Sequence, residues 1–347
     1  MSRRHDGASV APLCLDRQSR GEQYAPMHFG FSLPGRGALA VPDVLVKLAE
    51  KADGLRYASL FVTDHVVIPM AYRSKYPYSP TGQAAADWNQ GYLEPLALMG
   101  YLAGVTSRIK LGTSVLVVPY RNPVVTAKML ATLDVMSGGR IILGVGVGWL
   151  EEEFQALDSP PYTERGRVTD EYLRLMRECW TREPVQWKGH YYQMAEMSIM
   201  PKPRQAGGIP IWAGGHTDAA LRRTGELADG WHPIGHRPPA VLHPPEYADK
   251  VAIIHGWAAK AGRKASDITL SFRAPLDLMS ARAKRAPGDR QPFRGTAPEV
   301  IADIKSYQAI GVTQFVFDIV PQDLRLQLAM MERFADEVRP KTTRAPR

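Results

Sequence analysis

The chain has 347 residues, of which 45% are hydrophobic and 22% charged, as is ordinary for a globular enzyme, and its net charge of +8 is scattered, so nucleic-acid binding is not suggested. No apolar run reaches the roughly 20 residues that a membrane-spanning helix needs, and the polar start lacks the pattern of a secretory signal. The two cysteines, Cys14 and Cys179, lie far apart, so neither a disulfide framework nor a cysteine metal site is indicated, and a reducing cytoplasm fits.

Residues 1–26 lack sustained periodicity and are predicted to form a flexible extension before a domain at 27–338 and a tail at 339–347. Short apolar runs without polar alternation, which suit parallel strands covered on both faces, predict strands at 28–33, 57–63, 109–118, 140–147, 209–213, 230–234, 268–272 and 314–320. Helices are expected at 41–55, 92–105, 124–136, 163–181, 217–228, 247–261, 298–310 and 322–338. This alternation, with no composition break between the halves, predicts a single closed (β/α)₈ TIM barrel.

The unit from 109 to 147 is the best-formed strand-helix-strand segment. Its helix is indicated by Val125, Met129, Leu130 and Leu133, which recur at helical spacing, and is expected to stop at Ser137–Gly139. Both of its strands should end at the carboxyl edge of the barrel, where ligands of such folds bind.

Several connections are predicted as loops. Residues 64–91 are long and rich in Tyr, Pro, Gly and Ser, which favours an active-site loop insertion that covers substrate. The acidic run Glu151–Glu153 is interpreted as a turn, residues 187–194 as a surface hairpin, and residues 280–296 as a basic loop.

Three motifs could belong to a functional site. The GVGVG of Gly144–Gly148 fails the dinucleotide pattern because Trp149 stands where a glycine is needed. Asp64-His65 at the end of the second strand is either a turn cap beside an ordinary histidine or a hydrogen-bond anchor beside a group that titrates near neutrality. The histidines at 232, 236 and 243 have no acidic partner at ligand spacing, so no metal site is expected.

The Gly-Gly turn at 214–215 separates a strand from a helix whose cap is expected at Thr217 or His216. Such a turn directs free backbone N–H groups and the positive end of the helix at one point, which suits a phosphate. A plain connector remains the alternative.

Five segments, taken in order, closely resemble the luciferase-like monooxygenase superfamily, and more narrowly its oxidoreductases that use the deazaflavin coenzyme F420. They are TDH at 63–65, GTSVLVVPYRNPVVTAK at 112–128, SGGRIILGVGVGWLEEEF at 137–154, IPIWAGGHTDAALRR at 209–223 and ADGWHP at 228–233. The resemblance covers about residues 27–338. It implies a hydride-transferring enzyme that acts on a small molecule and forms a homodimer.

The resemblance also implies residue roles. Asp64 would anchor the cofactor ring, His65 would lie near the hydride-transfer position, and Ser114-Val115 would form a non-proline cis peptide behind the ring. The remaining implied cofactor contacts are Gly146, Val147 and Gly148 beside the ring, the phosphate turn of Gly214, Gly215, His216, Thr217 and Asp218, and the cofactor-facing Gly230 and Trp231.

One departure bears on the substrate, because the sugar-phosphate dehydrogenases of this group place a catalytic Glu where this chain has Trp149. Trp149 offers a stacking face and no base, so we expect an apolar or aromatic substrate, with His65 as proton donor or charge stabiliser. The alternatives are an FMN-dependent monooxygenase fed by a separate flavin reductase, and a non-catalytic flavin-binding barrel. The basic excess favours the coenzyme with an acidic polyglutamate tail.

Overall fold

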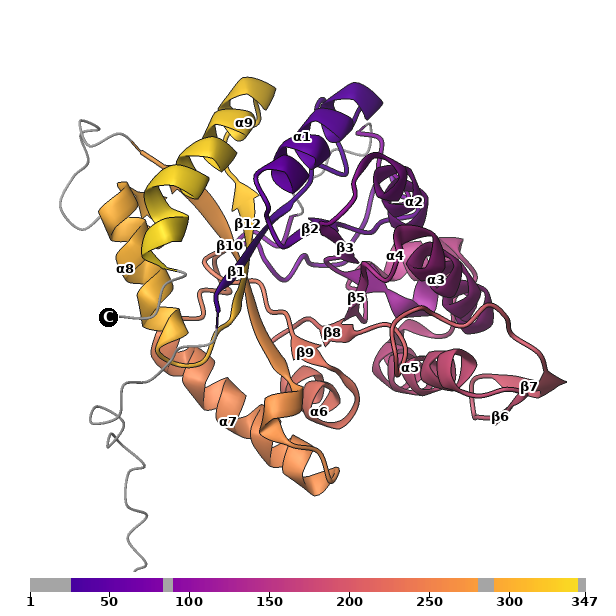
Figure 1. Cartoon of the computed structure of the whole chain (residues 1–347). Helices are drawn as coiled ribbons and strands as arrows, with labels where there is room; N and C mark the ends of the chain where they lie inside the picture. The colour runs from indigo at the N-terminus through magenta and orange to yellow at the C-terminus, as the bar shows by residue number, and fades with distance from the viewer. Residues whose placement is uncertain (1–25, 84–89, 280–289, 343–347) are drawn as a thin grey trace, which may run out of the picture.

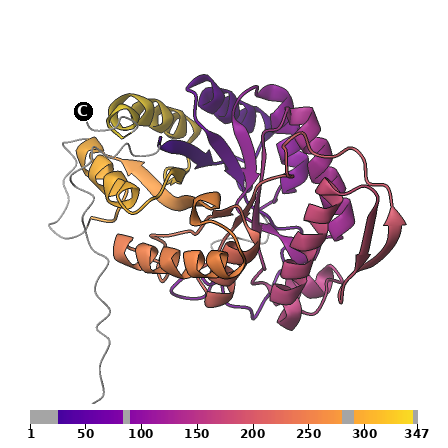
Figure 2. The same ribbon diagram turned by 60° about the horizontal axis from the view of Figure 1, so that its bottom comes forward.

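The computed structural model describes residues 26–83, 90–279 and 290–342, so the predicted N-terminal extension lies almost wholly outside the described residues. Its parallel strands follow one another around a ring that closes through the pairing of β9 with β10, which confirms the predicted TIM barrel (Figures 1 and 2). The barrel strands are β1 (His28–Ser32), β2 (Ser59–Val62), β3 (Lys110–Thr113) continued by β4 (Leu116–Val117), β5 (Ile141–Gly146), β8 (Ile211–Ala213), β9 (Gly230–Trp231), β10 (Thr269–Leu278) and β12 (Gln314–Ile319).

Helices surround the ring of strands (Figure 2). They are α1 (Pro42–Gly54), α2 (Pro95–Val105), α3 (Pro123–Ser137), α4 (Glu151–Ala156), α5 (Arg165–Thr181), α6 (Asp218–Leu227), α7 (Pro244–Lys260), α8 (Ala297–Gln308) and α9 (Leu324–Arg333). A proline in the first turn opens five of them, α1, α2, α3, α7 and α8, because its fixed backbone angle suits that position and its missing N–H would have had no partner there.

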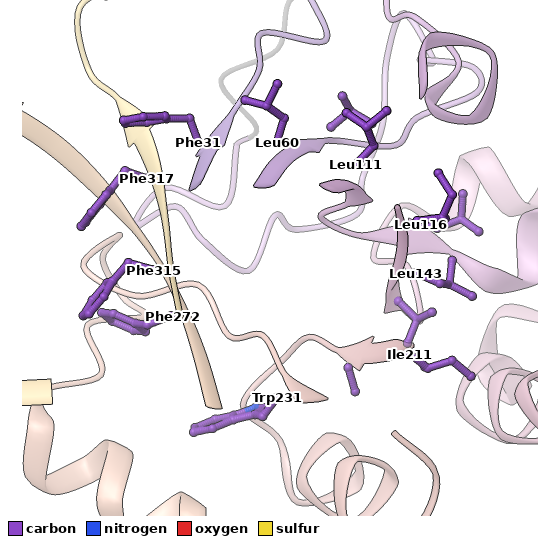
Figure 3. Close-up of a cluster of buried hydrophobic side chains, with 14 of the residues drawn as sticks. Phe31, Leu60, Leu111, Leu116, Leu143, Ile211, Trp231, Phe272, Phe315 and Phe317 are labelled. Carbon is purple, nitrogen blue, oxygen red and sulfur yellow. The ribbon is translucent and has the colours of Figure 1, made fainter. Parts of the chain in front are cut away.

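Most of the core lies outside the ring, and two smaller clusters accompany it, one inside the ring and one of Val117, Tyr120 and Phe154. Figure 3 shows large side chains that radiate outward from the strands toward the helices, among them Phe31, Phe317 and Trp231. Inside the ring, a smaller cluster consists of Phe61, Ile142, Trp212 and Val316.

The helix α3 ends as predicted, since Gly138 adopts the left-handed conformation (φ 77°) that closes it. The apolar residues that indicated this helix do not all face the core: Leu130 is buried, but Val125 and Met129 are 55% and 41% exposed. The small residues of this helix, Ala127 and Ala131, lie buried instead.

Other boundaries differ from the predictions. The acidic run at 151–153 is not a turn but the first turn of α4, and the strand expected at 109–118 is interrupted at Ser114-Val115. The strand expected at 230–234 ends at Trp231, whereas β10 runs on to Leu278. The predicted hairpin is present as β6 (Val185–Lys188) and β7 (Gln193–Met197), which project beyond α5 at the edge of the molecule (Figure 1).

The basic loop and the ends of the chain lie only partly within the described residues. Residues 280–289 of the basic loop are not among the described residues; of the rest, 294–295 form the short strand β11 beside β10. At the other end, η5 (Arg339–Lys341) and the buried Thr342 pack on the barrel, so the ordered chain continues past residue 338.

Candidate active site

A cavity of about 1440 Å³ opens at the carboxyl ends of the barrel strands. Its wall contains most of the residues that the sequence pointed to, namely Asp64, His65, Ser114, Val115, Gly146, Val147, Gly148, Trp149, Gly214, Gly215, His216 and Thr217. Asp218, Gly230 and Trp231 are not part of the wall. The volume is larger than that of a pocket for one drug-sized ligand, so a cofactor and a substrate can share it.

Gly230 and Trp231 serve the barrel rather than a ligand. The Trp231 side chain is buried beside Tyr247 of α7, and a Cβ on Gly230 would lie 2.6 Å from the ring of Trp212. Gly230 therefore leaves room for the Trp212 side chain inside the barrel. The resemblance had instead implied that Gly230 and Trp231 face the cofactor. The indole Nε1 of Trp231 does support the site indirectly, since it donates to the carbonyl oxygen of Gly215 (3.0 Å).

Asp64 is buried and its carboxylate is already paired. Arg121 donates to both of its oxygens (2.7 and 2.8 Å), and the backbone N–H of Val117 donates to Oδ2 (2.8 Å). Burial raises the pKa of the Asp64 carboxyl, and the Arg121 guanidinium opposes that shift. Asp64 thus ties the end of β2 to the residues that follow β4, and any contact with a ligand is additional to this pairing.

The peptide bond between Ser114 and Val115 is cis, as the resemblance implied. Polar side chains that are hydrogen-bonded to one another surround this peptide bond. Arg273 of β10 donates to the Ser114 carbonyl oxygen (2.7 Å), and the Ser114 hydroxyl lies 2.8 Å from His232 Nε2. Burial, with Arg273 nearby, lowers the pKa of His232 to about 3, so this histidine is neutral.

Val115 projects between two glycines that leave space for it. A Cβ on Gly146 would lie 2.5 Å from Val115 Cγ2, and one on Gly214 would lie 3.0 Å from Val115 Cγ1. Any larger residue at either position would have to displace Val115. The result is a shallow surface of backbone and one valine in the cavity wall, which fits one face of a flat ring.

The Gly-Gly turn leads into α6 as predicted, and Thr217 is its cap, with the hydroxyl accepting from the backbone N–H of Ala220 (3.3 Å). In the described part of the chain, Nε2 of His216 is buried without a hydrogen-bond partner. An unpaired buried ring nitrogen beside the N-terminus of a helix is open to a polar group of a ligand.

His65 is held by a residue that the sequence analysis missed. Its Nδ1 lies 2.7 Å from Oε2 of Glu153, whose side chain is completely buried in α4. Glu153 also accepts from the backbone N–H groups of Val66 and Val67 and from the Tyr120 hydroxyl. The acidic run was predicted to form a turn. Only the prediction of a helix at 151–156 would have indicated that its third residue, Glu153, faces inward.

Aromatic rings form the other side of the cavity. Trp149 packs edge-on against His65, Tyr72 and Tyr76, with ring centroids 6.1, 5.8 and 5.1 Å away. Burial raises the pKa of Tyr78 to about 12, so this residue stays a neutral hydroxyl. Tyr76 and Tyr78 line the cavity, whereas Tyr72 supports Trp149 from outside it.

The loop that carries these tyrosines is fastened to α4. Oε1 of Glu152 accepts from the backbone N–H groups of Arg73 (2.6 Å) and Ser74 (3.2 Å), and Oε2 accepts from the Ser74 hydroxyl. Residues 73–74 of the predicted insertion are therefore fixed to α4, directly before the residues of the loop that line the cavity. Residues 84–89 of that insertion lie outside the described residues.

The cavity wall carries an excess of positive charge. Its only acidic members among the described residues are Asp64 and Asp318, both of which are paired with arginines. The basic members are Arg36, Lys75, Arg165, Arg223, Arg237, Arg273 and Arg294. With the flat surface at Val115 and the open nitrogen of His216, this charge fits a flat-ringed cofactor with an anionic tail.

Within the described residues, no cluster of three or more His, Cys, Asp or Glu side chains has the arrangement of a metal site. The same residues include no helix that is long and apolar enough to cross a lipid bilayer.

Comparison with protein families decides where this site belongs. The family model for luciferase-like monooxygenases matches residues 27–286. The chain belongs to this family. The luciferase-like fold therefore accounts for the cavity at the carboxyl ends of the strands.

Relatives in this family cover the chain to different extents. An uncharacterized protein from Mycobacterium tuberculosis is 34% identical over 186 residues, which are 54% of this chain and 63% of that protein, so the match spans less than two thirds of its length. An F420-dependent glucose-6-phosphate dehydrogenase from Amycolatopsis mediterranei is 29% identical over 335 residues, or 86% of this chain and 94% of that enzyme.

Solved structures with this fold include enzymes of both cofactor types. An F420-dependent secondary alcohol dehydrogenase, in complex with an F420-acetone adduct, superposes with a TM-score of 0.72 at 18% identity, over 92% of this chain and 99% of that one. The oxygenating constituent of 3,6-diketocamphane monooxygenase from Pseudomonas putida, in complex with FMN, gives a TM-score of 0.68 at 18% identity, over 91% of this chain and 99% of that one. At this identity, the likeness concerns the fold.

Proposed function

We propose that this protein is an F420-dependent oxidoreductase that transfers a hydride between the deazaflavin and a small, apolar or aromatic organic substrate. The observation that carries the proposal is that one cavity combines the shallow surface at Val115, the His216 turn and the imidazole of His65. The F420-dependent relatives support the choice of cofactor. When bound, the deazaflavin supplies a ring carbon that accepts or donates the hydride.

Within this proposal, the chain's own residues divide the tasks. Val115, Gly146 and Gly214 bind one face of the ring, and the His216 turn with Thr217 holds the phosphate of the tail. His65 exchanges a proton with the substrate on the open side of the cavity. Trp149 and the tyrosine loop orient the substrate and exclude water.

The substrate is proposed to differ from that of the sugar-phosphate dehydrogenases, because Trp149 can neither accept a proton nor bind a hydroxyl through a carboxylate. The purified protein should therefore show no turnover of glucose 6-phosphate with F420. Aromatic or apolar secondary alcohols and the corresponding carbonyl compounds are the first substrates to assay. Turnover of glucose 6-phosphate at the rate of a dedicated dehydrogenase would contradict this substrate class.

The second candidate is an FMN-dependent monooxygenase supplied with reduced flavin by a separate reductase, which the likeness to an FMN-bound monooxygenase of this fold favours. Titration of the purified protein with F420 and with FMN, followed by fluorescence, separates the two. Tight F420 binding supports the first proposal, and tight FMN binding without F420 binding overturns it. A non-catalytic flavin-binding barrel would bind a cofactor yet show no hydride transfer to any substrate.

We further propose that two copies of the chain associate through α3. Val125, Met129 and Met136 lie on one face of this helix and are 55%, 41% and 75% exposed, which is unusual for apolar side chains repeated along one stripe. A second copy of the chain would cover them. Sedimentation velocity should show a dimer, and Met129→Glu should shift it to the monomer, whereas Lys110→Glu on β3 should not.

A further inference from the structure

Glu153 accepts hydrogen bonds at both of its carboxylate oxygens, in a completely buried position. Oε1 accepts from the backbone N–H groups of Val66 (2.7 Å) and Val67 (3.1 Å). Oε2 accepts from the Tyr120 hydroxyl (2.9 Å) and faces Nδ1 of His65 (2.7 Å). A carboxylate can serve all four neighbours because it only accepts hydrogen bonds.

This geometry determines which nitrogen of His65 carries the proton. A peptide N–H group can only donate, so Val66 and Val67 fix Oε1 in place and direct Oε2 at the imidazole. An acceptor at 2.7 Å from Nδ1 requires a proton on Nδ1. A neutral imidazole has a single N–H, so Nε2 then carries a lone pair.

Nε2 is also the nitrogen available to a ligand. His65 lines the cavity, its Nδ1 is taken by Glu153, and Nε2 has no hydrogen-bond partner within the described residues. The rings of Tyr92 and Trp149 flank the imidazole at 5.0 and 6.1 Å between centroids, and neither supplies a partner for Nε2.

We propose that Glu153 is a positioning residue that selects the Nδ1-protonated tautomer of His65 and so makes Nε2 the proton acceptor of the reaction. This rests on the proposed function. In the oxidising direction, the substrate O–H bond would break and its proton would move to Nε2, while the oxidised deazaflavin, when bound, would accept the hydride from the adjacent carbon. Glu153 then faces the imidazolium that has formed, and the reverse reaction returns the same proton to the substrate.

Glu153→Gln separates this role from that of holding the loop. The amide has the same shape but only one accepting oxygen, and the N–H groups of Val66 and Val67 must keep that oxygen. The amide NH₂ group is then turned toward His65, where a donor requires a lone pair on Nδ1. The proton should therefore move to Nε2 while the loop keeps its two backbone bonds.

The test is a long-range ¹H–¹⁵N NMR correlation on the full chain labelled with ¹⁵N-histidine, at a pH where the ring is neutral. The His65 signals are identified by their loss in His65→Asn. We expect the Nδ1–H pattern in the wild type and the Nε2–H pattern in Glu153→Gln. The matched control is Glu152→Gln, which changes the neighbouring residue of α4 that fastens the loop but does not contact His65, and it should keep the wild-type pattern.

Two results would overturn the assignment: an Nε2–H pattern in the wild type, or an unchanged pattern in a folded Glu153→Gln. These spectra need no cofactor, so they test the tautomer of His65 separately from the proposed function. The tautomer assignment can be refuted while F420 binds, and it can hold in a protein that does not bind F420. With F420 and substrate, Glu153→Gln should lower kcat by about 100-fold at nearly constant KM. An inverted tautomer with undiminished kcat would refute the catalytic half of the proposal.

Discussion

The two edges of the barrel use carboxylates in different ways. At the amino edge, acidic residues that end a helix or precede a strand accept from the backbone where another strand begins: the buried Asp53 from Ser107 (2.8 Å) and Ile109 (2.9 Å), and the partly exposed Asp229 from Ile211 (2.9 Å). At the carboxyl edge, Glu153 accepts from backbone groups in the same manner but also holds an imidazole. The same interaction closes turns at one edge and orients a reactive ring at the other.

Arginines show the same contrast. Arg140 at the amino edge donates to the carbonyl oxygens of Ser137, Ala103, Thr106 and Ile109, so its guanidinium is enclosed by backbone. Arg273 at the carboxyl edge donates to the Asp318 carboxylate and to the Ser114 carbonyl oxygen, and it also lines the cavity. Changes at the amino edge should therefore affect stability alone, and changes at the carboxyl edge should affect function as well.

The largest expected effect is at His65. His65→Ala should lower turnover by roughly 100- to 10,000-fold, because a positioned proton acceptor contributes about that much, and should leave the F420 dissociation constant nearly unchanged. Steady-state kinetics and cofactor titration measure the two quantities. His190→Ala, in the exposed hairpin, is the matched control, and equal turnover in both variants would remove His65 from the mechanism.

Removal of Arg121 tests whether a carboxyl-edge pair can also be structural. Arg121→Met leaves Asp64 buried with only the Val117 N–H as partner and should lower the free energy of unfolding by about 3 to 5 kcal/mol. Urea unfolding measures this. A loss of activity without loss of stability would show instead that Arg121 serves the ligand.

The matching test at the amino edge is Asp53→Ala. The N–H groups of Ser107 and of the buried Ile109 would lose their acceptor, so the free energy of unfolding should fall by about 2 to 3 kcal/mol. Turnover per folded molecule should stay at the wild-type value. Glu50→Ala, exposed in the middle of the same helix, should change neither quantity, and a reduced kcat in Asp53→Ala would break the contrast between the edges.

The smallest effect concerns acid stability at the carboxyl edge. Burial disfavours the charge of Asp318, but the guanidinium groups of Arg273 and Arg237 outweigh burial and lower its pKa from 3.8 to about 2. A lowered pKa means that the stabilisation is present above about pH 4 and is lost as pH falls toward 2. The difference in unfolding free energy between pH 5 and pH 2 should shrink by about 2 kcal/mol in Asp318→Asn and stay unchanged in Asp43→Asn.

The sequence predicts the barrel well because the alternation of short apolar runs with periodic helices is a local pattern repeated along the chain. It also predicts the location of the cavity, since parallel strands end at one edge. The cis peptide at Ser114-Val115 follows from the resemblance and not from any propensity of these two residues.

What the sequence did not predict depends on partners far away in the chain. Arg121 lies 57 positions from Asp64, and Glu153 lies 88 positions from His65, so neither pair leaves a spacing to recognise. Val125 and Met129 recur at helical spacing together with Leu130, yet they are exposed, and α3 packs through Leu130 and small residues such as Ala127 and Ala131. Trp231 was placed against the cofactor by the resemblance, whereas its side chain packs against Tyr247 of α7, a contact that the resemblance does not imply.

The first and last strands of the barrel lie side by side, with Phe29 opposite Phe315 and Phe31 opposite Phe317. While the chain is being made on the ribosome, β1 can pair with β2 early, but its other edge has no partner until residues 314–319 have emerged. Phe29, which is almost completely buried in the finished barrel, packs against Phe315, Phe317 and Phe334, so it lacks these partners during nearly the whole of synthesis. β1 is thus the segment that a nascent-chain chaperone would have to shield longest, and a transcript truncated before β12 would leave it as a permanent site of aggregation.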